Sequence, residues 1–147
     1  MAGLVYDDLI MDHIRNARHY CVPEGADASA TESNVLCGDE ITIYLKRRAG
    51  RIADIGYQAV SCGIAMASGS IMTEMVNGMR LAEAEALAHE MLSALNAGDP
   101  DMGAENSPER LALIDTLRRF PARVSCAALP WLTLERVLAS CVEETAT

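Results

Sequence analysis

Residues 41–60 read ITIYLKRRAGRIADIGYQAV, and they decide the fold. Apolar side chains alternate with other residues on both sides of Gly50, at Ile41, Ile43 and Leu45 before it and at Ile55, Tyr57 and Ala59 after it. Such alternation is typical of strands with one buried face, and Gly50 can adopt the positive φ that a tight connection requires. Ile52 is out of phase, which predicts a bulge near Asp54. The stretch therefore predicts a β-hairpin.

The hydrophobic period changes from 2 to about 3.6 after Cys62, which predicts helices for most of the remaining chain. Asn77-Gly78 ends the first of them, and Ser107-Pro108-Glu109 is a typical helix opening, with a capping hydroxyl, a proline and a carboxylate at the positive end of the dipole. Residues 22–34 are rich in turn-forming residues and leave room for a short edge strand. Helices are predicted over residues 4–17, 64–76, 81–95, 108–119 and 121–142, with Pro130 a kink or a restart in the last. Strands followed by helices indicate an α+β fold, with residues 1–147 as one domain.

The composition narrows the class of protein. The 147 residues are 50% hydrophobic but only 4% aromatic, so aliphatic side chains and methionines must fill the core, with Met66, Met72 and Met75 expected there. The net charge of −9 argues against nucleic acid or an anionic membrane as partner. It would suit a basic region on a protein partner, and it would equally keep an apolar-rich domain in solution. The first residues carry no basic segment and no apolar stretch approaches the ~20 residues of a membrane helix, so a cytoplasmic location is expected.

Cys37, Cys62 and Cys126 stand in settings that would expose and activate a thiol. Cys37 opens Cys37-Gly38-Asp39 ahead of the hairpin, and the other two lie near predicted helix starts, where the dipole and free amides stabilise a thiolate. The spacing excludes CxxC zinc-finger and thioredoxin motifs. Three thiolates and Asp39 would suit a tetrahedral zinc ion, and thiolates also hold iron–sulfur clusters. Ligand type alone does not separate the two.

The other cysteines and the histidines are expected outside this site. Cys141 lies in an apolar helical run and is expected in the core, and Cys21 has no partner motif. Five cysteines are an odd number in a chain without an export signal, which favours free thiols or metal ligands over a disulfide framework. Three histidines lie in helical segments and are expected to be structural or solvent-facing: His13, His19 and His89.

Four stretches resemble the iron–sulfur assembly proteins of the SufU/IscU/NifU type. They are YDDLIMDHIRN (residues 6–16), NVLCGD (34–39), GYQAVSCGIAMASGS (56–70) and FPARVSCAALPW (120–131). The 64 positions from Cys62 to Cys126 are more than IscU-type proteins use, and the extra length falls around residues 96–115. Ser125 stands where the IscU type has a histidine, and these two features favour the SufU branch. Ser125 also replaces the lysine common in that branch, and Asn16-Ala17 replaces an Asn-Pro pair.

The resemblance implies a small antiparallel sheet of about three strands packed against several helices. It also implies a partner, a pyridoxal-phosphate-dependent cysteine desulfurase of the SufS/IscS type, which presents sulfur as a persulfide. In the SufU-like interpretation the protein is a zinc-dependent sulfurtransferase whose zinc ligands are Cys37, Asp39, Cys62 and Cys126. Cys37 is then the expected sulfur acceptor, and Arg123 would support the persulfide or the Asp39 carboxylate.

Two further interpretations use the same residues. In one, the protein is a scaffold or carrier that assembles and transfers a [2Fe–2S] cluster, with Asp39 as an oxygen ligand that keeps the cluster labile. In the other, the protein is an interaction module with a structural zinc, and no thiol becomes accessible when a partner is added. Metal content and thiol reactivity distinguish the three.

Overall fold

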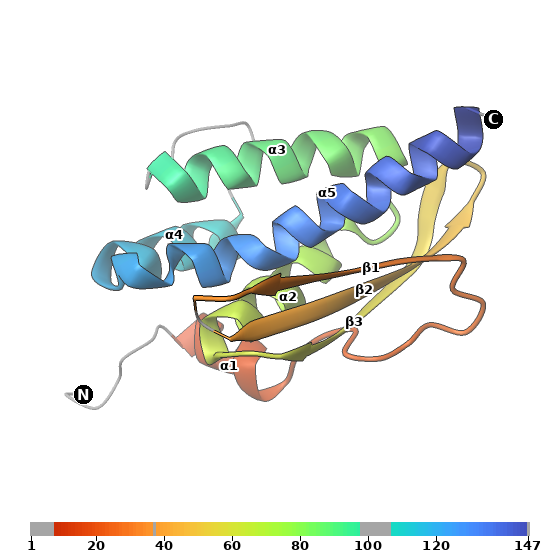
Figure 1. Ribbon diagram of the computed structural model, residues 1–147. Coiled ribbons are helices and arrows are strands. Elements are labelled where there is room, and N and C mark those ends of the chain that lie inside the picture. Colours follow the sequence, from red (N-terminus) through yellow and green to blue (C-terminus); the bar gives the residue numbers. More distant parts are fainter. Residues whose placement is uncertain (1–7, 37, 98–106, 147) are drawn as a thin grey trace.

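The computed structural model describes residues 8–36, 38–97 and 107–146 (Figure 1). One antiparallel sheet contains β1 (Ala28–Asn34), β2 (Asp39–Arg48) and β3 (Arg51–Val60), in the order β1-β2-β3. The helices are α1 (Asp8–Arg15), α2 (Gly63–Val76), α3 (Leu81–Ala97), α4 (Pro108–Arg119) and α5 (Val124–Ala146), with a 3-10 turn η1 (Pro121–Arg123) before α5. The expected α+β fold with a three-stranded antiparallel sheet is confirmed.

The β2–β3 hairpin forms where the alternation predicted it. Ala49 and Gly50 have positive φ angles of 53° and 75°, as a tight turn between twisted strands requires. Lys46 pairs with Asp54 and Arg47 with Ile52, which leaves Ala53 as the extra residue of a bulge beside the predicted position. The bulge explains why Ile52 is out of phase with the alternating residues after it. The extra residue turns the Ile52 side chain to the same buried face as Ile55 and Tyr57.

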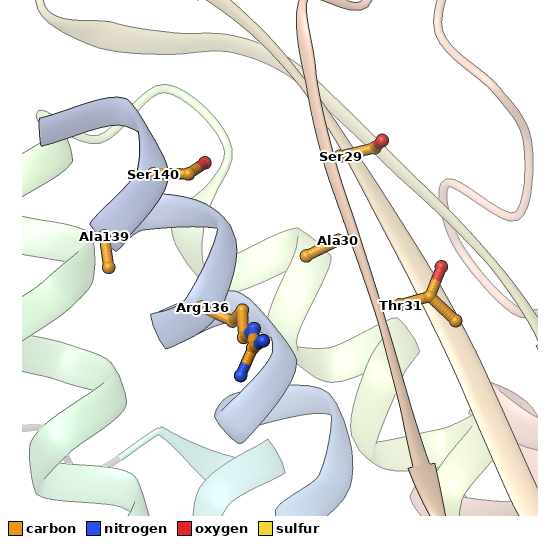
Figure 2. Close-up of a pocket in the computed structure, with 6 residues that line it drawn as sticks. All are labelled: Ser29, Ala30, Thr31, Arg136, Ala139 and Ser140. Atoms are coloured by element: carbon orange, nitrogen blue, oxygen red, sulfur yellow. The ribbon is translucent and has the colours of Figure 1, made fainter. Parts of the chain in front are cut away.

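β1 is a complete strand of seven residues, although its sequence is poor in strand-forming side chains. It pairs with β2 along its whole length, from Ala28 opposite Leu45 to Asn34 opposite Asp39. Its side chains alternate: Ala30 is partly buried and points toward α5, whereas Thr31 is exposed and points away (Figure 2). Pairing with β2, rather than its own propensity, therefore holds this strand.

α2 and α5 cover the inner face of the sheet. α2 lies so close to β3 that a Cβ added at Gly69 would be 2.8 Å from the Tyr57 ring, which explains why this helix is rich in small residues. α5 continues through Pro130, so the restart expected there does not occur. Among the expected core residues, Met72 and Cys141 are fully buried, and the other two methionines pack against the core.

Within the described residues, the structure contains no helix with the length and apolar character needed to span a membrane.

Candidate metal centre

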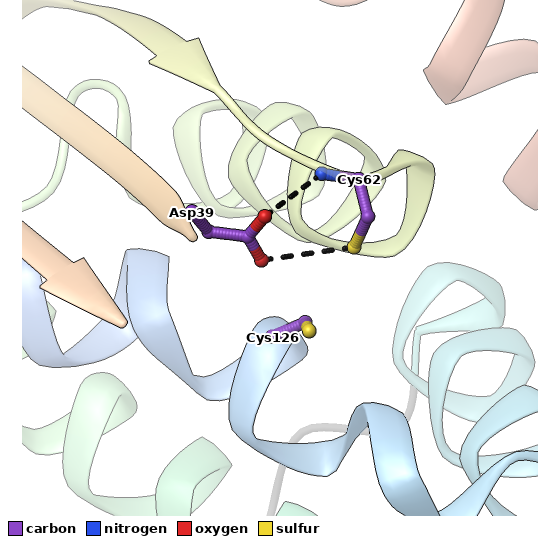
Figure 3. A group of neighbouring side chains, drawn as sticks. All are labelled: Asp39, Cys62 and Cys126. Carbon is purple, nitrogen blue, oxygen red and sulfur yellow. Dashed lines mark hydrogen bonds between the residues drawn. The ribbon is translucent and has the colours of Figure 1, made fainter. Parts of the chain in front are cut away.

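Three elements meet at one end of the sheet and bring Asp39, Cys62 and Cys126 together (Figure 3). Asp39 begins β2, Cys62 directly precedes α2, and Cys126 lies in the first turn of α5. One oxygen or sulfur atom of each residue lies within 4.8 Å of those of the other two. Ligand atoms of a tetrahedral zinc with bonds of about 2.0–2.3 Å are roughly 3.5–3.8 Å apart. The donor set and its spacing therefore fit a metal ion after a closure of about 1 Å.

Asp39 is held in place by the start of α2. The Cys62 N–H donates to Asp39 Oδ1 at 3.0 Å, and the Cys62 thiol lies 3.7 Å from Oδ2. Cys62 occupies the N-cap position of α2, but its own side chain caps no amide, so Asp39 supplies an acceptor from another element. One carboxylate oxygen is thus tied to the helix start, while the other faces the thiol.

Cys126 is fully buried and Cys62 is half-buried, so the expectation that both thiols would be exposed is wrong for Cys126. The reason lies in the packing of α5, whose first turns contact α2. The sequence correctly predicted that Cys126 lies near the start of a helix. It did not indicate which face of that helix other elements cover.

Ser68 holds the helix that carries Cys126 in position, and the sequence alone did not identify it. Its hydroxyl donates to the Ala127 carbonyl at 2.6 Å and accepts from Trp131 Nε1 at 3.1 Å, all within the core. This pair of bonds fixes α5 against α2 next to Cys126. Its only signal in the sequence is a small polar residue within an apolar helix.

Cys37 lies outside the described residues, so its position relative to the other ligands stays a prediction. Its neighbours lie in the connection between β1 and β2: Leu36 is 88% exposed, and Gly38 has a φ of 73° and donates to the Asn34 carbonyl at 2.8 Å. Because Asn34 pairs with Asp39, this connection begins at the same end of the sheet as the three grouped residues. Arg123 has an exposed side chain in η1, and its supporting role also stays a prediction.

Cys21 and the three histidines lie outside the group formed by the described residues. The carbonyl of Cys21 lies against Gly56, in the middle of β3, far along the strand from Cys62. His13 is buried with Nδ1 2.7 Å from Ser70 Oγ, and His89 is exposed and 3.0 Å from Glu135, as expected for structural and solvent-facing residues. His19 corrects one expectation, because it lies after α1 with a φ of 58° rather than in a helix.

Comparison with known proteins identifies the family. The model of the NifU-like N terminal domain matches residues 5–127. The chain belongs to this family. The resemblance carried by the four sequence stretches is thereby confirmed.

Relatives of the NifU-like domain carry two kinds of name. The chain is 30% identical over 135 residues to the iron-sulfur cluster assembly scaffold protein IscU of Thermotoga maritima, covering 92% of this chain and 93% of the relative. It is 28% identical over 136 residues to the zinc-dependent sulfurtransferase SufU of Bacillus subtilis, covering 92% and 90%. The crystal structure of FiSufU from Fervidobacterium islandicum AW-1 is similar with a TM-score of 0.81 and 27% identity, covering 94% of this chain and 99% of that one.

Proposed function

We propose that this protein acts in iron–sulfur cluster assembly as a zinc-dependent sulfur acceptor that takes persulfide sulfur from a cysteine desulfurase. The observation that carries the proposal is the convergence of Asp39, Cys62 and Cys126 within 4.8 Å, at the end of the sheet where the Cys37 connection begins. The similarity to a zinc-dependent sulfurtransferase over nine-tenths of both chains supports it. The proposal includes a cytoplasmic location, where thiols stay reduced.

The zinc ligands would be Cys37, Asp39, Cys62 and Cys126. When bound, zinc keeps coordinating thiols deprotonated and protects them from oxidation. Cys62 and Cys126 are anchored to helices, whereas Cys37 belongs to a connection flanked by an exposed Leu36 and by Gly38. This difference favours Cys37 as the acceptor, because its described neighbours are not anchored in the core.

The transfer is a thiol–disulfide type of exchange. The Cys37 thiolate attacks the terminal sulfur of the desulfurase persulfide, and a new sulfur–sulfur bond forms on Cys37. The original sulfur–sulfur bond breaks, and the desulfurase cysteine leaves as a thiolate with the electron pair of that bond. Exposed in η1, Arg123 would support the negative charge of the product persulfide.

The test is sulfur transfer from a purified cysteine desulfurase supplied with labelled cysteine. We expect Cys37→Ser to remove both the label on this chain and the stimulation of desulfurase turnover. Cys21→Ser is the matched control, because Cys21 is an exposed cysteine that lies beside the middle of β3, away from the grouped ligands. Full stimulation by Cys37→Ser would overturn the assignment of the acceptor.

A scaffold function is the second candidate, favoured by the 30% identity to an IscU scaffold over 92% of this chain. In that case the same four residues would hold a [2Fe–2S] cluster as cargo, and Asp39 would be the oxygen ligand that lets the cluster leave. Anaerobic reconstitution followed by transfer to an apo-ferredoxin tests it, with failure to build a cluster as the contradicting result.

A further inference from the structure

The two edges of the sheet differ in how they are covered. The edge of β3 is sealed by the segment after α1: the Tyr57 N–H donates to the His19 carbonyl at 3.0 Å. The Tyr20 hydroxyl accepts from the Ala59 N–H at 3.0 Å and donates to the Ala59 carbonyl at 2.9 Å. This covering satisfies backbone groups that would otherwise offer a template for another strand.

The edge of β1 has a groove in place of such a covering. Within the described residues, the only strand paired with β1 is β2, on its other side. A hollow of about 580 Å³ lies along β1 beside α5 and is lined by Ser29, Ala30, Thr31, Arg136, Ala139 and Ser140 (Figure 2). These side chains are mostly small, so a second backbone could approach β1 closely. Residues 28–34 also contain neither proline nor lysine, the residues that commonly protect an edge.

The groove continues along β1 toward the metal centre. A second hollow of about 440 Å³ shares Arg136 with the first, and a third of about 590 Å³ shares Leu129 and Leu132 with the second. The third hollow reaches Leu36 and Ser125, the chain neighbours of Cys37 and Cys126. The lining is mostly polar in the first hollow and mostly apolar in the third, the one nearest the metal centre, where Val35 is 91% exposed.

Resting on the proposed function, we propose that this groove binds an extended segment of the cysteine desulfurase, which adds as a strand to the free edge of β1. The seven residues of β1 offer about 23 Å of backbone at ~3.3 Å per residue. Main-chain hydrogen bonds would supply affinity, and alternate side chains of the segment would enter the groove. Because the groove ends at Leu36 and Ser125, a segment lying in it would carry the sulfur donor toward the metal centre.

The chemistry of the groove specifies the segment. Where the groove meets the metal centre, the segment needs apolar side chains to cover Leu36 and Leu132. At the opposite end of the groove it needs small side chains, to fit between Ala30 and Ser140. Arg136 Nη1 lies 3.2 Å from Glu32 Oε1 and links α5 to β1 at the junction of the hollows. Arg136 is exposed and Glu32 is half-buried, so the pair is largely solvated and weak, and the guanidinium remains available to a carboxylate of the segment.

The first test is amide hydrogen exchange of the full chain with and without the purified desulfurase. Strand addition predicts that amides of residues 28–34 gain protection in the complex. Unchanged exchange of these amides in a complex that forms would overturn the groove proposal and leave the proposed function standing. Protection that develops in the protein alone as its concentration rises would assign the groove to a second copy and would also overturn it.

The second test is a matched pair of tryptophan substitutions. Ser140 points toward β1 (Figure 2), so Ser140→Trp fills the groove, whereas Ser93→Trp places the same side chain on the exposed face of α3. We expect Ser140→Trp to raise the Kd for the desulfurase at least about tenfold and Ser93→Trp to leave it unchanged. Equal Kd values in two folded variants would contradict the proposal. Failure of the wild-type chain to bind or stimulate the desulfurase would instead remove the proposed function, and this inference with it.

Discussion

Asp39 performs two tasks at the scale of a single residue. It accepts a hydrogen bond from the Cys62 amide at 3.0 Å, and it places its second oxygen beside the Cys62 thiol. Because the carboxylate is only 4% exposed, its orientation is fixed by the protein before any metal binds. One side chain thus joins the start of β2, the start of α2 and the metal centre.

Two substitutions separate these tasks. Asp39→Asn keeps an oxygen acceptor for the Cys62 amide and removes the charge, whereas Asp39→Ala removes both. We expect each to weaken zinc binding at least about tenfold. Only Asp39→Ala should also destabilise the metal-free protein, by about 1–3 kcal/mol, because the partly buried Cys62 amide loses its partner. Competition with a chromogenic chelator and urea unfolding measure the two effects, with the exposed neighbour Glu40→Gln as control. Unchanged zinc affinity would exclude Asp39 as a ligand.

His13 makes stability depend on pH. Burial, and then the charge of Arg18, lower the pKa of this histidine below its ordinary value of 6.5, although Glu74 partly opposes the shift. The unfolded chain therefore binds a proton more readily than the folded one. The contribution of His13 is complete above about pH 6.5 and is lost as the pH falls from there through the folded pKa.

We expect His13→Gln to reduce the loss of stability between about pH 7.5 and about pH 5, because glutamine does not titrate and can still bond to Ser70. Urea unfolding at the two pH values measures the difference. Equal pH dependence in the two proteins would contradict this account of His13.

The contact between α2 and α5 positions the buried thiol at the scale of secondary-structure elements. Ser68 is the central residue of this contact, because it bonds to both Ala127 and Trp131. Removing its hydroxyl leaves a buried carbonyl and a buried indole N–H without that partner. The helix bearing Cys126 is therefore fixed by a polar bridge through an otherwise apolar interface.

We expect Ser68→Ala to lower the free energy of unfolding by about 1–3 kcal/mol and to weaken zinc binding through loss of the Cys126 position. Ser140→Ala is the matched control, because Ser140 is only partly buried and bonds to a carbonyl of its own helical turn. Urea unfolding of both variants measures the effect. A loss of equal size in the control would mean that the bridge has no special role.

Elements whose apolar residues recur with a regular period could be predicted from the sequence. Elements without such a period could not. Alternation located the hairpin, and the shift to a 3.6-residue period located α2. The full length of β1 was missed because pairing with β2, rather than its side chains, specifies it. Among the candidate ligands, Asp39, Cys62 and Cys126 do come together. The burial of Cys126 and the bond from the Cys62 amide could not be predicted, since both depend on how elements distant in the chain pack.

At the scale of the whole molecule, Arg110 is a charged side chain buried in a largely apolar core. It lies in the first turn of α4 and is fully buried, and its three guanidinium nitrogens have no hydrogen-bond partner among the described residues. A guanidinium keeps its charge at any pH that the folded protein experiences. Burying this charge with no hydrogen-bond partner among the described residues costs free energy, which the rest of the core offsets.

We expect Arg110→Met to stabilise the fold, by about 1–4 kcal/mol, because methionine fills a similar space without a charge. Arg118→Met, on an exposed position of the same helix, should change stability by less than about 0.5 kcal/mol. Thermal and urea unfolding measure both. A clear loss of stability in Arg110→Met would show that the guanidinium has a partner in solution.

The central claim is that this protein carries a zinc site built from three thiols and a carboxylate and uses it to accept sulfur. The most direct measurement is the content of zinc, iron and acid-labile sulfide per chain in protein purified without oxygen. The account predicts about one zinc and no sulfide, as a four-ligand site requires. Iron and sulfide in equal amounts, near two of each, would contradict it and identify the protein as a cluster scaffold.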